Sequence, residues 1–278
     1  MNPDKSIRRR GVYLLPNLLT SAALFAAFYS IISGINGQYE SAAIAIIVAG
    51  ILDGLDGRVA RLTNTQSDFG EQYDSLADLI SFGLAPALLA FNWSLASLSD
   101  ISIMAGKLGW LASFLFVACA ALRLARFNTQ AGIADKSYFQ GLASPAAAGT
   151  LVFTIWFFID NGVAGESVRW LIFFEIIALG LLMFSRVRYY SFKTGPSGDK
   201  VPTLWIFLAI LIIVLLALDP PIMGMIFGSA YVLSGLLITI AGRRNWKLKR
   251  GKRPGKENRT EPVMGSDTQV SEDEDGPV

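Results

Sequence analysis

The chain has 278 residues, of which 53% are hydrophobic and only 17% charged, and its mean hydropathy is +0.46. Soluble domains carry about 25% charged residues, so this composition excludes an ordinary soluble protein. The net charge of +2 is small, and we expect no nucleic-acid partner. The chain has no histidine and one cysteine, Cys119. Acid–base chemistry must therefore come from carboxylates, lysines or tyrosines, and a disulfide within the chain is excluded.

Apolar segments follow one another along most of the chain. With their flanks, they approach the roughly 20 residues that a helix needs to span a bilayer. The first segment continues into FYSII without a small-residue cleavage site, which indicates a retained span rather than a signal peptide. We therefore predict an all-α, polytopic transmembrane helix bundle of about eight spans, near 14–34, 41–61, 71–92, 108–128, 143–160, 168–187, 201–218 and 221–242.

Basic residues are distributed unevenly between the predicted loops. If the N-terminus is cytoplasmic, 22 of the 24 lysines and arginines lie on the inside, and only Lys107 and Arg169 lie outside. The positive-inside rule then predicts an N-in/C-in topology. We predict three regions: a basic cytoplasmic segment (1–13), a membrane domain (14–245) and a cytoplasmic tail (246–278). The tail is basic, then acidic, without apolar periodicity, so we expect it to be disordered.

Four aspartates stand between spans two and three, in the stretch DGLDGRVARLTNTQSDFGEQYDSLAD (53–78). Asp53 and Asp56 are spaced i, i+3 and Asp74 and Asp78 are spaced i, i+4, so each pair projects from one side of its helix. At 1.5 Å per residue, all four lie roughly 6–13 Å below the cytoplasmic turn. We expect the four carboxylates to converge on one shallow site within the membrane.

Carboxylates this close repel one another, and each is costly to place in a membrane. Oxygen ligands without His or Cys suit hard cations such as Mg²⁺, Mn²⁺ or Ca²⁺, and four carboxylates suffice for a two-metal site of phosphoryl transfer. Arg61, at the cytoplasmic rim, is placed to meet a phosphate. Three other interpretations stay open: structural pairing of the aspartates with Arg58 and Arg61, the ion pathway of a cation-coupled transporter, and a scaffold with a structural metal.

The same stretch resembles the signature of the CDP-alcohol phosphotransferases, D-x2-D-G-x2-A-R-x8-G-x3-D-x3-D, without a departure. The matching positions are Asp53, Asp56, Gly57, Ala60, Arg61, Gly70, Asp74 and Asp78. The resemblance implies that Asp53, Asp56 and Asp74 bind two divalent cations, Mg²⁺ or Mn²⁺, and that Asp78 is both a metal ligand and the general base.

The resemblance also implies a nucleotide site. Residues at the positions of Gly57, Arg61 and Ser67 contact the cytidine nucleotide and its pyrophosphate in that family. The segment PNLLT (16–20) is similar to the family's nucleotide-side segment, and we expect Asn17 to contribute there.

Three further stretches resemble bacterial membrane-embedded phosphatidylserine synthases: RLARFNTQ (123–130), FQGLASPAAAG (139–149) and SRVRYYSFK (185–193). Ala143 stands where that group has proline. An amino-acid acceptor brings a carboxylate that arginine's fork suits. Arg126 with Asn128 is the first choice for serine binding, and Arg186 and Arg188 are candidates for holding serine or a lipid phosphate.

Together these resemblances imply transfer of the phosphatidyl group of CDP-diacylglycerol to L-serine, giving phosphatidylserine and CMP. They also imply an inner-membrane enzyme of the bacterial type, surrounded by membrane lipids, with its active site facing the cytoplasm. A homodimer is expected, and GMIFG (224–228) offers a GxxxG contact. The alternative within this class is the same chemistry on glycerol 3-phosphate, inositol phosphate or choline.

Overall fold

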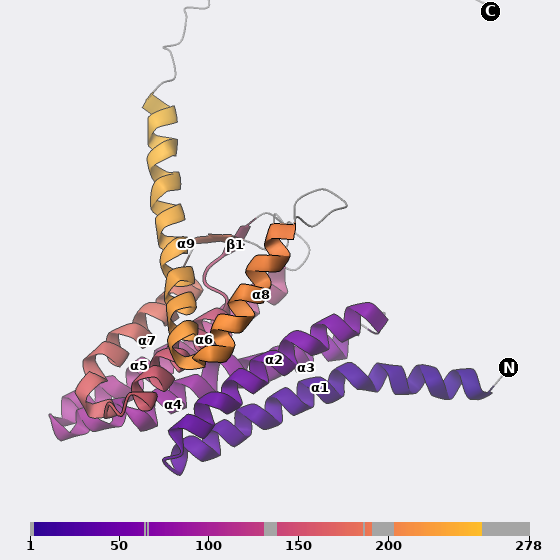
Figure 1. The fold of residues 1–278 in the computed structure, drawn as a ribbon, viewed down its shortest axis with the longest axis horizontal. Helices are drawn as coiled ribbons and strands as arrows, with labels where there is room; N and C mark the ends of the chain where they lie inside the picture. The colour runs from indigo at the N-terminus through magenta and orange to yellow at the C-terminus, as the bar shows by residue number, and fades with distance from the viewer. Residues whose placement is uncertain are drawn as a thin grey trace, which may run out of the picture. The chain divides into compact units, whose positions relative to one another are not determined.

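Helices make up nearly all of the described structure. The computed structural model describes residues 3–63, 65, 67–130, 138–185, 187–190 and 203–251. The elements, labelled in Figure 1, are α1 (Pro3–Ile35), α2 (Tyr39–Thr63), α3 (Asp68–Asp78), the π-helix η1 (Leu79–Leu84), α4 (Ala85–Trp93), the 3₁₀-helix η2 (Leu95–Asp100), α5 (Ile103–Gln130), β1 (Tyr138–Gln140), α6 (Ser144–Asp160), the 3₁₀-helix η3 (Gly165–Val168), α7 (Arg169–Phe184), β2 (Arg188–Tyr190), α8 (Thr203–Leu218) and α9 (Pro220–Gly251). The helical class predicted from the sequence is confirmed.

Helices α1 and α2 form an antiparallel hairpin and lie side by side along their lengths (Figure 1). The turn between them contains Gly37 at a φ of 76°, a conformation that glycine adopts without steric cost. Both helices carry fully buried alanines, among them Ala27, Ala42 and Ala49, and Ala42 of α2 lies beside Gly34 of α1. Small side chains let the two backbones approach closely. The hairpin therefore brings the second half of α2, with its aspartates, against the middle of α1.

The third predicted span is a nearly continuous helical run, α3–η1–α4. Ser67 caps its start, because its Oγ accepts a hydrogen bond from the Gly70 N–H at 3.1 Å. The π-helical turn η1 begins directly after Asp78. Such turns inside α-helices are rare and are frequent at functional sites. This run thus carries two of the predicted site aspartates immediately before a local change of helix geometry.

Helices α5, α6 and α7 contribute most of the largest buried side chains. Phe116, Leu151, Ile155, Ile176 and Met183 are all fully buried. The segment that leads into α6 is tied to the end of α7, because the Leu142 N–H donates to the Leu182 carbonyl at 3.0 Å. Beside this link, β1 and β2 form an antiparallel pair of three residues each, which the sequence did not predict.

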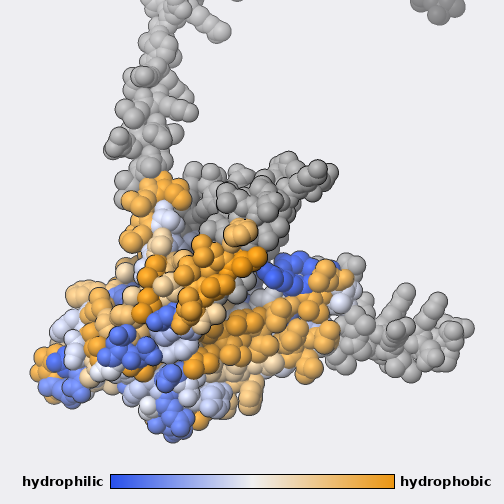
Figure 2. All heavy atoms as spheres, viewed as in Figure 1, coloured by the Kyte–Doolittle hydropathy of each residue, from blue (hydrophilic) through white to orange (hydrophobic). Residues whose placement is uncertain are grey.

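Each of the eight predicted spans coincides with a helical element. Among the residues that the structure describes, five stretches are long and apolar enough to cross a membrane: Leu15–Ile35, Asp68–Trp93, Ile103–Thr129, Gly165–Phe184 and Pro220–Thr239. The outer faces of these helices carry exposed apolar side chains, for example Phe25, Phe114 and Phe174, and Figure 2 shows broad apolar areas along them. The number of eight spans and the N-in/C-in orientation stay predictions, as do the three region boundaries. Most of the tail lies outside the described residues.

The two glycines of GMIFG, Gly224 and Gly228, pack against another helix of the same chain. A Cβ on Gly224 would collide with the ring of Phe153, and one on Gly228 would lie 2.7 Å from the Thr150 Oγ1. Both partners belong to α6, so α9 packs on α6 through its small residues. The predicted homodimer is not tested by this contact and stays a prediction.

Candidate active site

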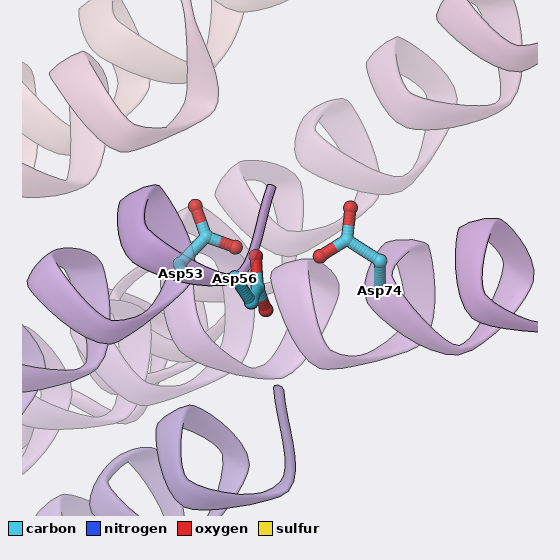
Figure 3. A group of neighbouring side chains, drawn as sticks. All are labelled: Asp53, Asp56 and Asp74. Atoms are coloured by element: carbon cyan, nitrogen blue, oxygen red, sulfur yellow. The ribbon is translucent and has the colours of Figure 1, made fainter. Parts of the chain in front are cut away.

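Three of the four predicted aspartates lie together, contributed by two helices. Asp53 and Asp56 come from α2 and Asp74 comes from α3, and one carboxylate oxygen from each lies within 4.8 Å of the others. Figure 3 shows the three side chains turned toward one another across the gap between these helices. The spacing predicted that four carboxylates converge, and three of them lie together in the described structure.

Asp78 adjoins this cluster at the end of α3. It lies one helical turn beyond Asp74, and its carboxyl group is close enough to that of Asp53 for the two to interact. It is therefore positioned on the far side of the cluster from the N-terminal end of α3. Asp53, Asp56 and Asp74 with the adjoining Asp78 are called the aspartate row below.

A side chain of helix α1 forms a hydrogen bond to Asp56. The Thr20 hydroxyl, which is buried, donates to the Asp56 Oδ2 at 2.6 Å. A neighbouring contact joins the Ser21 Oγ and the Tyr73 hydroxyl at 2.8 Å, and so ties α1 to α3 beside Asp74. The sequence pattern did not indicate that Thr20 contacts Asp56, because the two residues are 36 positions apart.

The donor set fits divalent cations. Asp74 and Asp78 each have a buried Oδ1 without a hydrogen-bond partner among the described residues. Buried carboxylate oxygens rarely stay unpaired, and like charges at this separation repel strongly. A hard cation satisfies the free oxygens and removes the repulsion together, and oxygen-only ligation suits Mg²⁺ or Mn²⁺.

A pocket of about 490 Å³ opens beside the cluster, toward the N-terminal end of α3. All four residues that the resemblance assigned to the nucleotide, Asn17, Gly57, Arg61 and Ser67, line it together with Asp56 and Asp74. A Cβ on Gly57 would meet no atom within 4 Å, so this wall of the pocket is open. The remaining lining residues are Pro16, Thr20, Ala60, Thr65, Asp68, Gly70 and Glu71.

The charge of this pocket also points to a cation. Its lining includes four acidic side chains, Asp56, Asp68, Glu71 and Asp74, and one basic side chain, Arg61. A diphosphate would be repelled by this lining. Divalent cations on the aspartates would reverse the local charge and make the pocket suitable for a diphosphate.

Arg126 and Asn128, the residues predicted to bind serine, contact different helices. The Arg126 guanidinium donates to the carbonyl oxygens of Phe184 and Ser185, at 3.2 and 3.5 Å, and lies over the Phe184 ring. The Asn128 Nδ2 donates to the Ser75 Oγ at 3.0 Å, which brings it against the helix of Asp74 and Asp78.

The other two arginines give less information. Arg186 lies outside the described residues, and Arg188 is described only as a backbone position of β2, opposite Gln140. A role in acceptor or lipid binding stays a prediction for Arg186, Arg188, Arg126 and Asn128.

We predict that Thr20→Val weakens metal binding about 10-fold, near the lower limit for loss of a hydrogen bond that orients a metal ligand. Valine keeps the shape of threonine but cannot donate to Asp56. The check is the Mg²⁺ or Mn²⁺ concentration that gives half-maximal activity of the purified protein. Thr20→Ser, which keeps the hydroxyl, should restore most of the affinity. An unchanged metal requirement in Thr20→Val would show that this hydrogen bond does not position Asp56.

These features define a helical membrane protein with a carboxylate cluster that could hold a metal, next to a polar pocket. A family model described as CDP-alcohol phosphatidyltransferase matches residues 13–182, which include the whole aspartate signature. The chain belongs to this family.

Its relatives include a CDP-diacylglycerol–serine O-phosphatidyltransferase of Helicobacter pylori, 38% identical over 81% of this chain and 91% of the relative. A protein of the same name from Mycobacterium tuberculosis is 34% identical over 64% of this chain and 62% of the relative. The archaetidylserine synthase of Methanothermobacter thermautotrophicus is 35% identical over 63% of this chain and 69% of the relative.

Proposed function

We propose that this protein transfers the phosphatidyl group of CDP-diacylglycerol to the hydroxyl of L-serine, giving phosphatidylserine and CMP. The observation that carries the proposal is the row of four aspartates beside the pocket lined by Asn17, Gly57, Arg61 and Ser67. Serine as the acceptor rests on the names of the relatives. All three named above specify serine, although the archaeal name specifies a different lipid.

The aspartates would hold two divalent cations, with Asp53, Asp56, Asp74 and Asp78 as ligands. When bound, these ions neutralise the pyrophosphate and the charge that develops during displacement. Helix α1 contributes through Thr20, which fixes the orientation of Asp56. The nucleotide would occupy the pocket, with Arg61 toward its phosphates and the open wall at Gly57 giving room for close approach.

In the reaction, the serine hydroxyl oxygen attacks the phosphorus that carries diacylglycerol. The bond from that phosphorus to the CMP oxygen breaks, and CMP leaves on the opposite side. Asp78 accepts the hydroxyl proton. One displacement step suffices, because the chain has no histidine and its single thiol, Cys119, is buried within α5.

The location that fits this reaction is a bacterial-type inner membrane, with the site facing the cytoplasm. The exposed apolar faces of the helices support membrane insertion. The positive-inside pattern supports the orientation, because Arg58 and Arg61 stand at the same end of α2 as the pocket. We further propose a homodimer, on the family resemblance alone.

We predict that the purified protein releases CMP from CDP-diacylglycerol only when L-serine and a divalent metal are both present. The measurement supplies L-serine, glycerol 3-phosphate, inositol phosphate or choline in turn and follows CMP by chromatography. The control omits metal and adds a chelator, which should stop release. Release with another acceptor would retain the aspartate chemistry and overturn serine. If folded protein released no CMP with any acceptor, the transporter and scaffold interpretations would return.

A further inference from the structure

Arg123 lies in the part of α5 that packs beside Asp78, because α5 meets η1 at Ala120 and Gly83 and meets α3 at Asn128 and Ser75. Its guanidinium is partly buried. Its Nη1 donates to the Ser144 Oγ at 3.0 Å, at the start of α6. It interacts electrostatically with Asp78 and with Tyr231 of α9. Four helices, α3, α5, α6 and α9, therefore contribute to its surroundings.

This guanidinium is incompletely satisfied. Its Nε is buried and has no hydrogen-bond partner among the described residues, and in that part of the chain Arg123 forms no ion pair with a carboxylate. A buried donor without an acceptor is unfavourable, so an anion that docks here would accept a hydrogen bond from the free Nε–H and pair with the guanidinium charge. Arginine's planar fork is suited to a carboxylate.

The position of Arg123 indicates which substrate would supply the anion. The nucleotide pocket is lined by Asp56 and Asp74 but not by Asp53, Asp78 or Arg123. Along α3 the order is Ser67 at the pocket, then Asp74, then Asp78, which lies about 6 Å further along the helix axis. In an in-line displacement the attacking and leaving oxygens lie on opposite sides of the phosphorus. The side away from the pocket, where Arg123 lies, is therefore the side of the acceptor.

Arg126, one turn further along α5, is less available to an acceptor. Its guanidinium already donates to two backbone carbonyls at the end of α7. It also lies over the Phe184 ring, as a side chain that ties α5 to α7 would. The unused donor is on Arg123.

We propose that Arg123 binds the α-carboxylate of the amino-acid acceptor and so places the acceptor hydroxyl beside Asp78. This rests on the proposed function and adds the residue that recognises an amino acid as opposed to a neutral alcohol. Ser144, at the start of the SPAAAG segment, holds the guanidinium in place.

The test measures KM for L-serine and KM for CDP-diacylglycerol in Arg123→Lys and Arg123→Gln. We expect the serine KM to rise roughly 10–100-fold, the range for losing a hydrogen bond to a charged group. We expect the CDP-diacylglycerol KM to stay within about 2-fold, because the nucleotide pocket is separate. The rise in melting temperature on adding CMP with Mg²⁺ should also persist. Arg169→Lys is the matched control. Arg169 is also a partly buried arginine that donates one hydrogen bond within the protein, to the Ser97 carbonyl, and its substitution should change neither KM.

A second measurement compares acceptors in the same protein, and its wild-type arm does not depend on the folding of a variant. L-serine is compared with serinol and with L-serine methyl ester, which keep the hydroxyl and lack the carboxylate. We expect wild type to prefer serine at least about 10-fold in kcat/KM, and Arg123→Gln to lose most of that preference.

Equal use of serine and serinol by wild type would overturn the assignment of Arg123, as would a parallel rise of both KM values in the variants. In either case serine-dependent CMP release by wild type would leave the proposed function intact. Absence of that release, in protein that CMP still stabilises, would overturn serine as the acceptor and this inference with it.

Discussion

Replacing Asp78 with asparagine should lower kcat for serine-dependent CMP release roughly 10²–10⁴-fold, the range that general-base catalysis supplies. Asparagine matches aspartate in shape but cannot accept the hydroxyl proton. Asp78 ends α3 at the side of the row away from the pocket, beside Asp53, where the acceptor oxygen is expected. The measurement is the steady-state rate at saturating serine and metal.

The fold of this variant should be intact. Removing one of several neighbouring like charges relieves repulsion, so the melting temperature of the metal-free protein should be equal to or above that of wild type. Asp100→Asn provides the control, because Asp100 is exposed in η2 and lies outside the site. A variant at Asp78 that retained more than about a tenth of the wild-type rate would exclude it as the base.

The parts of this site that could be predicted from the sequence are the local ones. The spacing of Asp53 with Asp56 and of Asp74 with Asp78 fixes which side of a helix each pair shares, and a short connection fixes that the two helices are neighbours. Apolar segment length likewise predicted the helices. Both inferences depend only on residues close in sequence, and both agree with the structure.

The parts that could not be predicted depend on distant contacts. Thr20 meets Asp56 across 36 residues, and only the depth at which α1 lies against α2 determines this pairing. The π-turn after Asp78 also has no clear signature in LISFGL.

Arg123 and Arg126 illustrate the same limit. Both satisfy the positive-inside rule and both lie in the RLARFN segment. Arg126 is the residue predicted from the sequence to bind serine, and Arg123 is not singled out there. The structure separates them by their partners, Ser144 on α6 for one and the carbonyls ending α7 for the other. Which arginine has a free donor is decided by the packing of three helices, not by either residue's neighbours in sequence.

Replacing Asp74 with asparagine should raise the metal concentration for half-maximal activity at least about 10–100-fold, because even residues that only orient metal ligands have effects of that size. Asp74 supplies one of three carboxylate oxygens that lie within 4.8 Å of one another, and its Oδ1 is buried without a partner in the described structure. The amide keeps an oxygen ligand but loses the charge. The check is a titration of CMP release with Mg²⁺ and, separately, with Mn²⁺.

Thermal unfolding gives a second measurement. The direction of the change in melting temperature follows from the repulsion between the clustered aspartates. In wild type, chelation leaves clustered carboxylates without a cation, so removal of metal should lower the melting temperature. In Asp74→Asn the repulsion is weaker and metal binding is weaker, so the difference between metal-bound and metal-free protein should shrink. Asp160→Asn, at the exposed end of α6, should retain the full difference. If wild type and Asp74→Asn responded alike to chelation and to the metal titration, Asp74 would not be a ligand, and the pairing of the aspartates would have to be structural.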